Sequence, residues 1–172
     1  MNVDFDGSLL CPTSWNRPVD FISLKARSKS RGILYIWDTN FFVKEDFILE
    51  DGFTAFWGTW VVFQDRVGFI NVYTPLTIAS KRRLWSTILS FLVNNRNIKW
   101  VVLGDFNETR SPNIRKGSKF SYTGVALFND FINMADLSEV TSGGRKYTRM
   151  SADRVKHSKL DRFFVSRKFL ES

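Results

Sequence analysis

The sequence is poor in several kinds of residue, and each shortage excludes a class of protein. Cys11 is the only cysteine, so neither an internal disulfide nor a cysteine-rich zinc site can form. No apolar run approaches the roughly 20 residues of a membrane-spanning helix. The N-terminus lacks the basic-then-apolar pattern of a signal peptide. We therefore expect an intracellular protein of the nucleus or cytoplasm, where thiols stay reduced, without a membrane partner.

The residues that are present suit one folded domain. A chain of 172 residues can bury about 70% of its unfolded surface, and 44% hydrophobic residues with six tryptophans argue against disorder. Pro12, Pro18 and several serines interrupt any periodicity near the N-terminus. We expect a poorly organised segment at 1–30, followed by a domain at 31–172.

Positive charge gathers in the C-terminal part. Lysine and arginine exceed the acids by 25 − 17 = +8, and residues 141–172 hold nine basic and three acidic residues, a net of +6. A basic segment can bind a polyanion, because each neutralised phosphate releases counterions. A solvated basic surface is the alternative interpretation of the same charge.

Periodicity predicts strands and helices in alternation. Short apolar, β-branched and aromatic runs predict strands at 32–38, 53–63, 67–73, 100–103, 143–150 and 159–166. Apolar residues spaced three and four apart predict helices at 77–95 and 123–137. Thr123 is a candidate cap for the second helix, and Asn94 and Asn95 suit the end of the first. This order favours a mixed α/β sandwich over a doubly wound parallel sheet.

The stretch WVVLGDFNETR at 100–110 places polar residues where a buried strand ends. Gly104 allows a sharp turn, after which Asp105 and Asn107 can face the same way. A carboxylate there can accept a proton from water or bind a hard cation, and an amide can hold a phosphoryl oxygen. A plain turn remains the alternative, because glycine, aspartate and asparagine are common turn residues.

Four segments then occur in a telling order. They are INVYTP at 70–75, WVVLGDFNETRSPNIRKGS at 100–118, FNDFINMADLSEV with GGRKYT within 128–148, and SKLDRFFVS at 158–166. Together they resemble the endonuclease/exonuclease/phosphatase family, and most of all the endonuclease domain of plant non-LTR (LINE-type) retrotransposons. The resemblance implies a four-layer α+β sandwich of two mixed, mainly antiparallel sheets flanked by helices. It also implies Mg²⁺-dependent hydrolysis of phosphodiesters.

The resemblance assigns roles to four residues of this chain. Asp105 matches the acid that orients or deprotonates the attacking water, and Asn107 matches the amide that contacts the scissile phosphate and helps Asp105 hold the metal. Tyr73 matches a tyrosine whose hydroxyl lies near the phosphate. Asp161 matches the aspartate that orients the catalytic histidine. Without the resemblance, Tyr73 could simply close a strand against the core, and Asp161 could pair with a surface cation.

Two departures from the family pattern carry expectations of their own. Residues 1–30 supply no match to the family's first strand or its metal-binding glutamate, since Asp4, Asp6 and Asp20 lie on no predicted apolar strand. His157 precedes the SKLD motif, whereas the family's catalytic histidine follows it. We therefore expect a domain incomplete at both termini that binds Mg²⁺ weakly. A partner chain or a parent polyprotein would then supply the missing strands.

Three functions are consistent with these observations. The first is an active DNA-nicking endonuclease. The second, which the incomplete set favours, is an endonuclease-like domain that cleaves little alone and binds nucleic acid. The third is a phosphoesterase acting on inositol phosphates or lipids, which the sequence motifs RSP and LDRFFVS disfavour. Nonspecific contacts to DNA phosphates are expected from Arg110, Arg115, Lys116, Arg145 and Lys146.

Overall fold

The computed structural model describes residues 17–24, 33–111, 115–116, 121–140, 148–150 and 157–171. The strands are β1 (Val19–Leu24), β2 (Ile33–Asp38), β3 (Phe42–Glu50), β4 (Phe53–Trp60), β5 (Asp65–Tyr73), β6 (Lys99–Asp105), β7 (Arg115–Lys116), β8 (Leu137–Glu139), β9 (Arg149–Met150), β10 (His157–Ser158) and β11 (Asp161–Ser166). The helices are α1 (Ile78–Asn94), α2 (Tyr122–Met134) and α3 (Arg167–Leu170).

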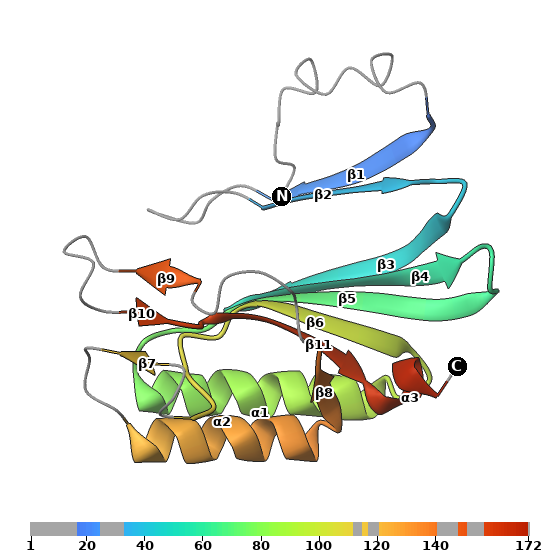
Figure 1. Ribbon diagram of the computed structural model, residues 1–172. Coiled ribbons are helices and arrows are strands. Elements are labelled where there is room, and N and C mark those ends of the chain that lie inside the picture. Colours follow the sequence, from blue (N-terminus) through green and yellow to red (C-terminus); the bar gives the residue numbers. More distant parts are fainter. Residues whose placement is uncertain are drawn as a thin grey trace.

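A six-stranded sheet forms the centre of the molecule (Figure 1). Its strand order is β3-β4-β5-β6-β11-β8. Strands β5 and β6 are parallel, because α1 connects them and returns the chain to the same end of the sheet. The other neighbouring pairs are antiparallel. Both β5 and β6 therefore end at the edge of the sheet where α1 begins.

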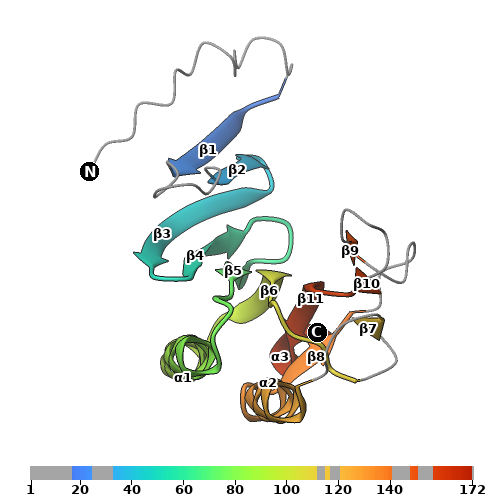
Figure 2. The same cartoon turned by 90° about the vertical axis from the view of Figure 1, so that its left-hand side faces the viewer.

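Helices α1 and α2 lie side by side along one face of this sheet (Figures 1 and 2). Thr77 caps α1 by accepting a hydrogen bond from the backbone N of Ser80. Ser121, rather than the predicted Thr123, caps α2 through the backbone N of Gly124. Trp85 joins the helices by stacking on Phe128, with ring centroids 5.2 Å apart. Their buried residues form one hydrophobic core with the facing strands.

The two-stranded sheet β1–β2 covers part of the other face of the large sheet (Figure 1). Tyr35 and Trp37 of β2 pack on Phe56, with ring centroids 4.8 and 5.8 Å away. Strand β1 lies within the segment expected to be poorly organised, so the expectation that no apolar strand carries Asp20 was wrong. Asp20 is exposed on β1 and pairs in register with Trp37.

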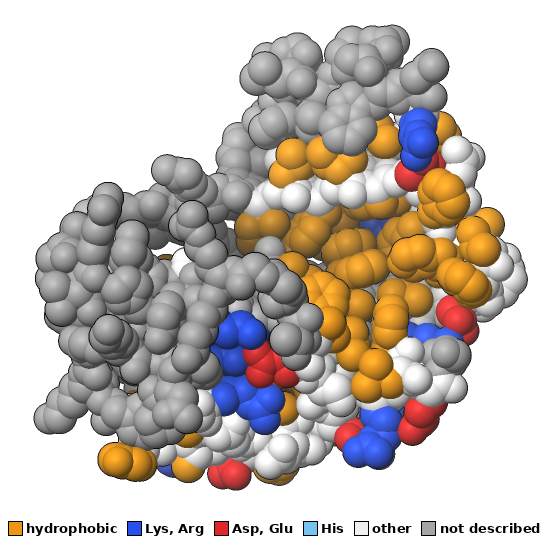
Figure 3. Space-filling model, viewed as in Figure 1, with side chains coloured by type: hydrophobic (Ala, Val, Ile, Leu, Met, Phe, Trp, Pro, Cys, Tyr) orange, Lys and Arg blue, Asp and Glu red, His pale blue; other side chains and the backbone are white. Residues whose placement is uncertain are grey.

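The large sheet has an exposed edge at β3. Val43, Phe47 and Leu49 of this strand are more than 40% exposed. Figure 3 shows hydrophobic side chains gathered below β2 on the face turned toward the viewer, whereas β3 lies toward the back of this view (Figures 2 and 3). A β-bulge between Lys44 and Asp46 interrupts the strand, a device that limits edge-to-edge pairing. No helix among the described residues is long and apolar enough to cross a membrane.

The predicted fold class is confirmed: among the described residues, three helices and sheets of two, three (order β7-β10-β9) and six strands form an α+β arrangement whose main sheet is not closed. The predicted helices lie within one to three residues of α1 and α2. The sequence did not predict β3 or β8. Of the strand predicted at 143–150, only Thr148 and β9 fall within the described residues.

Candidate functional site

Three polar side chains lie in a row across the ends of adjacent strands. Tyr73, the last residue of β5, is the register partner of Asp105, the last residue of β6. Asp105 is in turn the register partner of Asp161, the first residue of β11. Partners on neighbouring strands lie about 5 Å apart between Cα atoms. The fold thus brings together residues from three predicted motifs at one edge of the sheet, the edge that faces the viewer in Figure 2.

Gly104 does not form the predicted turn: it lies within β6, next to Asp105, and pairs with Val72 on β5 and Arg162 on β11. Its φ of +133° lies in a region that L side chains rarely adopt. A Cβ at this position would lie 2.1 Å from the backbone O of Val72, which leaves no space for a side chain. Immediately after Asp105, the fully buried Phe106 anchors the chain, and its backbone N donates to the O of Leu160 at 3.0 Å. The ends of β5, β6 and β11 are therefore fixed relative to one another.

Asn107 is held in a left-handed conformation, with φ of +44°, by contacts on both sides. Its backbone N donates to Oδ1 of Asp105 at 2.9 Å. Its side-chain Nδ2 donates to the O of Thr74 at 2.7 Å. Because Nδ2 binds the end of β5, the other amide atom, Oδ1, is the one suited to a cation or a donor. The predicted pair Asp105 and Asn107 is thus one connected unit.

The exposure of the four residues decides between alternatives. Tyr73 is 64% exposed, so it does not close β5 against the core. Asp161 is exposed too, and no described lysine or arginine forms an ion pair with it. Asp105 and Asn107 are half-buried. The row therefore borders solvent, where a large substrate can reach it.

Thr148 positions one end of the row, and the sequence analysis did not single it out. Its Oγ1 accepts hydrogen bonds from the backbone N of Leu160 at 3.0 Å and of Asp161 at 3.1 Å. These contacts fix the start of β11 and hence the position of Asp161. The threonine lies within the quoted segment GGRKYT, so its place in the motif was the available signal.

A group of cations surrounds Glu139 near the start of β11. Its carboxylate binds Arg162 at 2.7 Å, and Arg110 and Lys159 each at 3.2 Å. Burial alone would raise the pKa of Glu139, but the three cations outweigh it and hold that pKa below its ordinary value. Arg110 also donates to Oδ1 of Asn129, so this predicted DNA contact has structural partners as well. Three cations around one carboxylate leave net positive charge on the helix-facing side of β11, opposite the face that carries Asp161.

The other predicted contacts are less fully described. Arg115 and Lys116 form β7, which pairs with β10 so that Lys116 lies opposite His157. Arg145 and Lys146 lie outside the described residues.

A buried ion pair lies behind Asn107. Lys81 of α1 binds Glu108 at 2.7 Å, and their side chains are only 6% and 3% exposed. Nζ of Lys81 also donates to the backbone O of Asn107 at 2.6 Å. The sequence analysis did not single out Lys81. Its spacing of three and four residues from Leu84 and Trp85 was the signal that it shares their buried face.

Comparison with known proteins places this geometry in a known fold. No family model matches the sequence, and no curated protein is similar to it in sequence. Among solved structures, the endonuclease domain of TRAS1, a telomere-specific non-LTR retrotransposon, aligns with a TM-score of 0.56 at 13% identity, over 90% of this chain and 70% of that one. An endonuclease/exonuclease/phosphatase family protein from Bacteroides thetaiotaomicron aligns with a TM-score of 0.56 at 12% identity, over 87% and 61%. The AP endonuclease LMAP from Leishmania major aligns with a TM-score of 0.60 at 12% identity, over 87% and 62%.

This chain has the endonuclease/exonuclease/phosphatase fold. At these identities the likeness shows the fold alone. The chain spans 61–70% of the length of the three structures. Within that fold, the row Tyr73–Asp105–Asp161 lies at the ends of strands on a rigid sheet, where loops and strand ends commonly carry function.

The endonuclease/exonuclease/phosphatase fold implies a divalent cation, and the donor set of the row can be tested for it. No group of three or more histidine, cysteine, aspartate or glutamate side chains gathers among the described residues. Mg²⁺, however, usually takes only one or two protein carboxylates and completes its shell with water and phosphate oxygens. Asp105, Asn107 and the neighbouring Asp161 are oxygen donors of that kind. The described residues therefore fit a weak Mg²⁺ site rather than a closed one.

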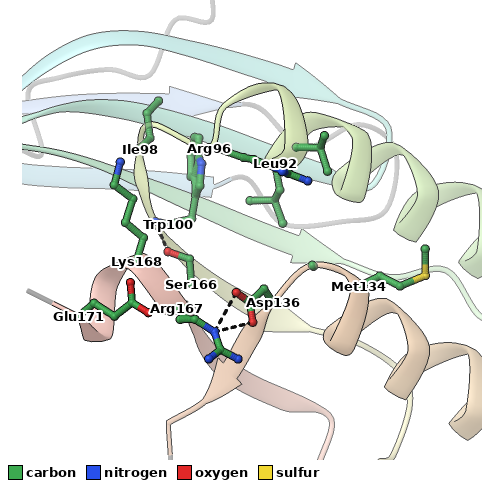
Figure 4. Close-up of a pocket in the computed structure, with 12 residues that line it drawn as sticks. Leu92, Arg96, Ile98, Trp100, Met134, Asp136, Ser166, Arg167, Lys168 and Glu171 are labelled. Atoms are coloured by element: carbon green, nitrogen blue, oxygen red, sulfur yellow. Dashed lines mark hydrogen bonds and ion pairs between the residues drawn. The ribbon is translucent and has the colours of Figure 1, made fainter.

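A groove of about 540 Å³ lies at the opposite end of β6, remote from the row (Figure 4). Trp100, near the start of β6, lines it together with residues from the ends of α1 and α2 and from α3. Two of its charged groups pair with each other: Arg167 donates to both carboxylate oxygens of Asp136, at 2.9 and 3.0 Å. The row, and not this groove, holds the site residues predicted from the sequence.

Proposed function

We propose that Tyr73, Asp105, Asn107 and Asp161 form a Mg²⁺-dependent phosphodiester-hydrolysing site of the non-LTR retrotransposon endonuclease type, and that this chain alone cleaves DNA slowly. One observation supports this most: the register partnership that aligns Tyr73, Asp105 and Asp161 on three adjacent strands. A plain turn at GDFN would not require acids and a phenol from three separate motifs to meet. The similarity to nuclease structures is consistent with the same substrate class.

Each residue has a role that its position allows. Asp105 accepts a hydrogen bond or a proton from the attacking water. Asn107 orients the phosphate by donating the second hydrogen of its Nδ2, since the first binds the O of Thr74. The hydroxyl of the exposed Tyr73 donates to a phosphoryl oxygen as negative charge develops there. Asp161 acts as the second acid, holding a cation with Asp105 or orienting a proton donor. Asp105 and Asn107 would hold a Mg²⁺, which when bound would neutralise charge and make a bound water more acidic.

Slow cleavage follows from the small number of acidic ligands. With two carboxylates in the described row, cation affinity rests largely on water and substrate oxygens. Losing one well-placed electrostatic group commonly costs about 10² to 10³ in rate. We further propose that a partner chain or polyprotein segment supplies groups that raise the rate.

DNA binding is proposed to depend on phosphate contacts rather than on base contacts. The net charge of +8 and the cations around Glu139 provide an attractive field. Arg110, Arg115, Lys116, Arg145 and Lys146 are the proposed contacts. Such contacts give nonspecific affinity with dissociation constants of about 10⁻⁴ to 10⁻⁶ M.

A plasmid-nicking assay with Mg²⁺ tests the proposal. The chain should nick supercoiled DNA at a rate at least about 10²-fold below that of a complete nuclease of the same fold assayed in parallel. Asp105→Ala should remove the remaining nicking while leaving DNA affinity in place. Nicking that survives Asp105→Ala would refute the site, and nicking as fast as that of the complete nuclease would refute the claim of low activity.

A non-catalytic nucleic-acid-binding domain is the second candidate. The observation in its favour is that the described residues gather no third acid or histidine. It predicts DNA binding with no Mg²⁺-dependent nicking at any protein concentration, so the same assay separates the two functions.

A further inference from the structure

The buried ion pair between Lys81 and Glu108 is an unusual feature for the core of a small domain. Each of the two side chains is less than 10% exposed. Removing two charges from water costs several kcal/mol per ion, and apolar pairs of similar volume are often at least as stable. Lys81 also lies near the N-terminus of α1, where the helix dipole disfavours a cation. Stability alone therefore does not account for this pair.

The contacts of Lys81 point to the loop that carries Asn107. Its Nζ bonds at once to Oε2 of Glu108 and to the backbone O of Asn107, at 2.7 and 2.6 Å. One ammonium group thus links α1 to the two residues that follow Phe106. Asn107 has a left-handed backbone, which costs free energy for a residue other than glycine unless neighbouring contacts compensate.

Helix α2 completes the arrangement from the other side. A Cβ at Gly124 would lie 2.2 Å from Oε2 of Glu108, so the carboxylate packs directly on the helix backbone. Oε1 of the same carboxylate accepts from the backbone N of Thr109 at 3.1 Å. The pair thereby connects α1, the loop after β6 and the first turn of α2.

We propose that Lys81, Glu108 and Gly124 are positioning residues. The buried ion pair packs on the helix backbone at Gly124 and holds Asn107 in the conformation in which its backbone N–H binds Asp105 and its side-chain amide binds Thr74. In this arrangement Asn107 keeps both its bond to Oδ1 of Asp105 and its bond to the O of Thr74. The significance for hydrolysis rests on the proposed function. The conformational claim does not, and it can be tested without any cleavage.

The test is amide hydrogen exchange followed by NMR, with Val101 in the centre of the sheet as the internal reference. The first variant, Lys81→Met/Glu108→Leu, removes both charges and avoids leaving one buried alone. The exchange rate of the Asn107 backbone amide should rise at least about tenfold, while that of Val101 stays within about twofold. General destabilisation would instead raise both rates by the same factor.

Gly124→Ala is the second variant, and it changes no charge. Alanine favours a helix by about 1 kcal/mol over glycine, so α2 itself should not be weakened. Its Cβ would displace the Glu108 carboxylate and should reproduce the faster exchange at Asn107.

A matched control is available at the other end of β6. Lys99 binds Asp65 at 2.6 Å in a partly buried ion pair that is remote from Asn107. Lys99→Met/Asp65→Leu should leave exchange at Asn107 unchanged. The proposal is overturned if Asn107 exchanges at the native rate in both the Lys81→Met/Glu108→Leu and Gly124→Ala variants. It is also overturned if the Lys99→Met/Asp65→Leu control accelerates Asn107 equally.

Cleavage provides a separate arm. If the proposed function holds, both positioning variants should lower the nicking rate more than the affinity for DNA. Faster exchange at Asn107 with no loss of nicking would keep the positioning claim and reject the role of Asn107 in hydrolysis. The two failures are therefore distinguishable.

Discussion

Asp105 and Asp161 are register partners on the antiparallel strands β6 and β11, although they belong to motifs far apart in the sequence. Their Cα atoms are therefore about 5 Å apart. Their register brings the two side chains to the same face and the same edge of the sheet, where they could hold a divalent cation together. This relationship makes the end of the sheet a candidate cation site, as the proposed function requires.

Gly104→Ala should destabilise the protein by about 2 kcal/mol or more, because alanine combines an unfavourable positive φ with a Cβ 2.1 Å from the O of Val72. For a chain of this size, that loss corresponds to a fall in Tm of roughly 4–8 °C. Differential scanning calorimetry measures the change. Ser86→Ala, at an exposed position of α1, is the control and should change Tm little. A Gly104→Ala protein with native Tm would show that this position of β6 tolerates a side chain.

DNA affinity should fall steeply with salt, and Arg115→Ala/Lys116→Ala should reduce the slope of log affinity against log salt concentration by about 2. The reason is that each lost phosphate contact releases one counterion fewer. Fluorescence anisotropy with a labelled duplex measures the slope. Arg66→Ala is the control for lost positive charge. Arg66 lies at the start of β5 and binds Glu45 of β3, so it is not one of the proposed phosphate contacts. A slope equal to that of the native chain would exclude both residues from the interface.

Glu139 should make stability depend on pH in the acid range. Its pKa in the folded protein is lower than in the unfolded chain, because three cations outweigh the effect of burial. The stabilisation it contributes is therefore complete above its unfolded pKa of about 4.3, and it is lost as pH falls further through the folded pKa. Glu139→Gln should cost about 2 kcal/mol at neutral pH, since it deprives the buried Arg162 of its partner.

Urea denaturation at neutral and acid pH measures this effect. The difference between native protein and Glu139→Gln should shrink as pH falls below about 4.3. Glu50→Gln, an exposed substitution on β3, controls for the change in net charge. A difference that stays constant with pH would show that the carboxylate does not titrate as described.

Much of the fold follows from local sequence patterns. The apolar stripe of Leu84, Trp85, Ile88, Leu89 and Leu92 predicted α1, and the uniformly apolar WVVL predicted a buried β6. The edge strand β3 was missed because Lys44, Glu45 and Asp46 interrupt its alternation at the bulge. Its stability depends on pairing with β4, which no local pattern reveals. The cap of α2 was predicted two residues late, because Ser121 and Thr123 are both suitable caps by residue type.

The candidate site shows the same division. The GDFN and LDRF motifs predicted Asp105, Asn107 and Asp161, and strand register accounts for their proximity. Lys81 was missed because its burial depends on Glu108, a residue from a loop beyond β6. A lysine on a helix is normally an exposed cation, and only the tertiary partner reverses that expectation.

Mn²⁺ paramagnetic broadening in an NMR spectrum tests the central claim most directly, because it locates the cation without requiring cleavage. The account predicts that the amides of Tyr73, Asp105, Asn107 and Asp161 broaden first, and that Asp105→Asn/Asp161→Asn abolishes this broadening. The carboxylates Asp136 and Glu171 of the distant groove should be unaffected at the same Mn²⁺ concentration. Broadening that appears first at the groove, or that survives the double substitution at the row, would contradict the account.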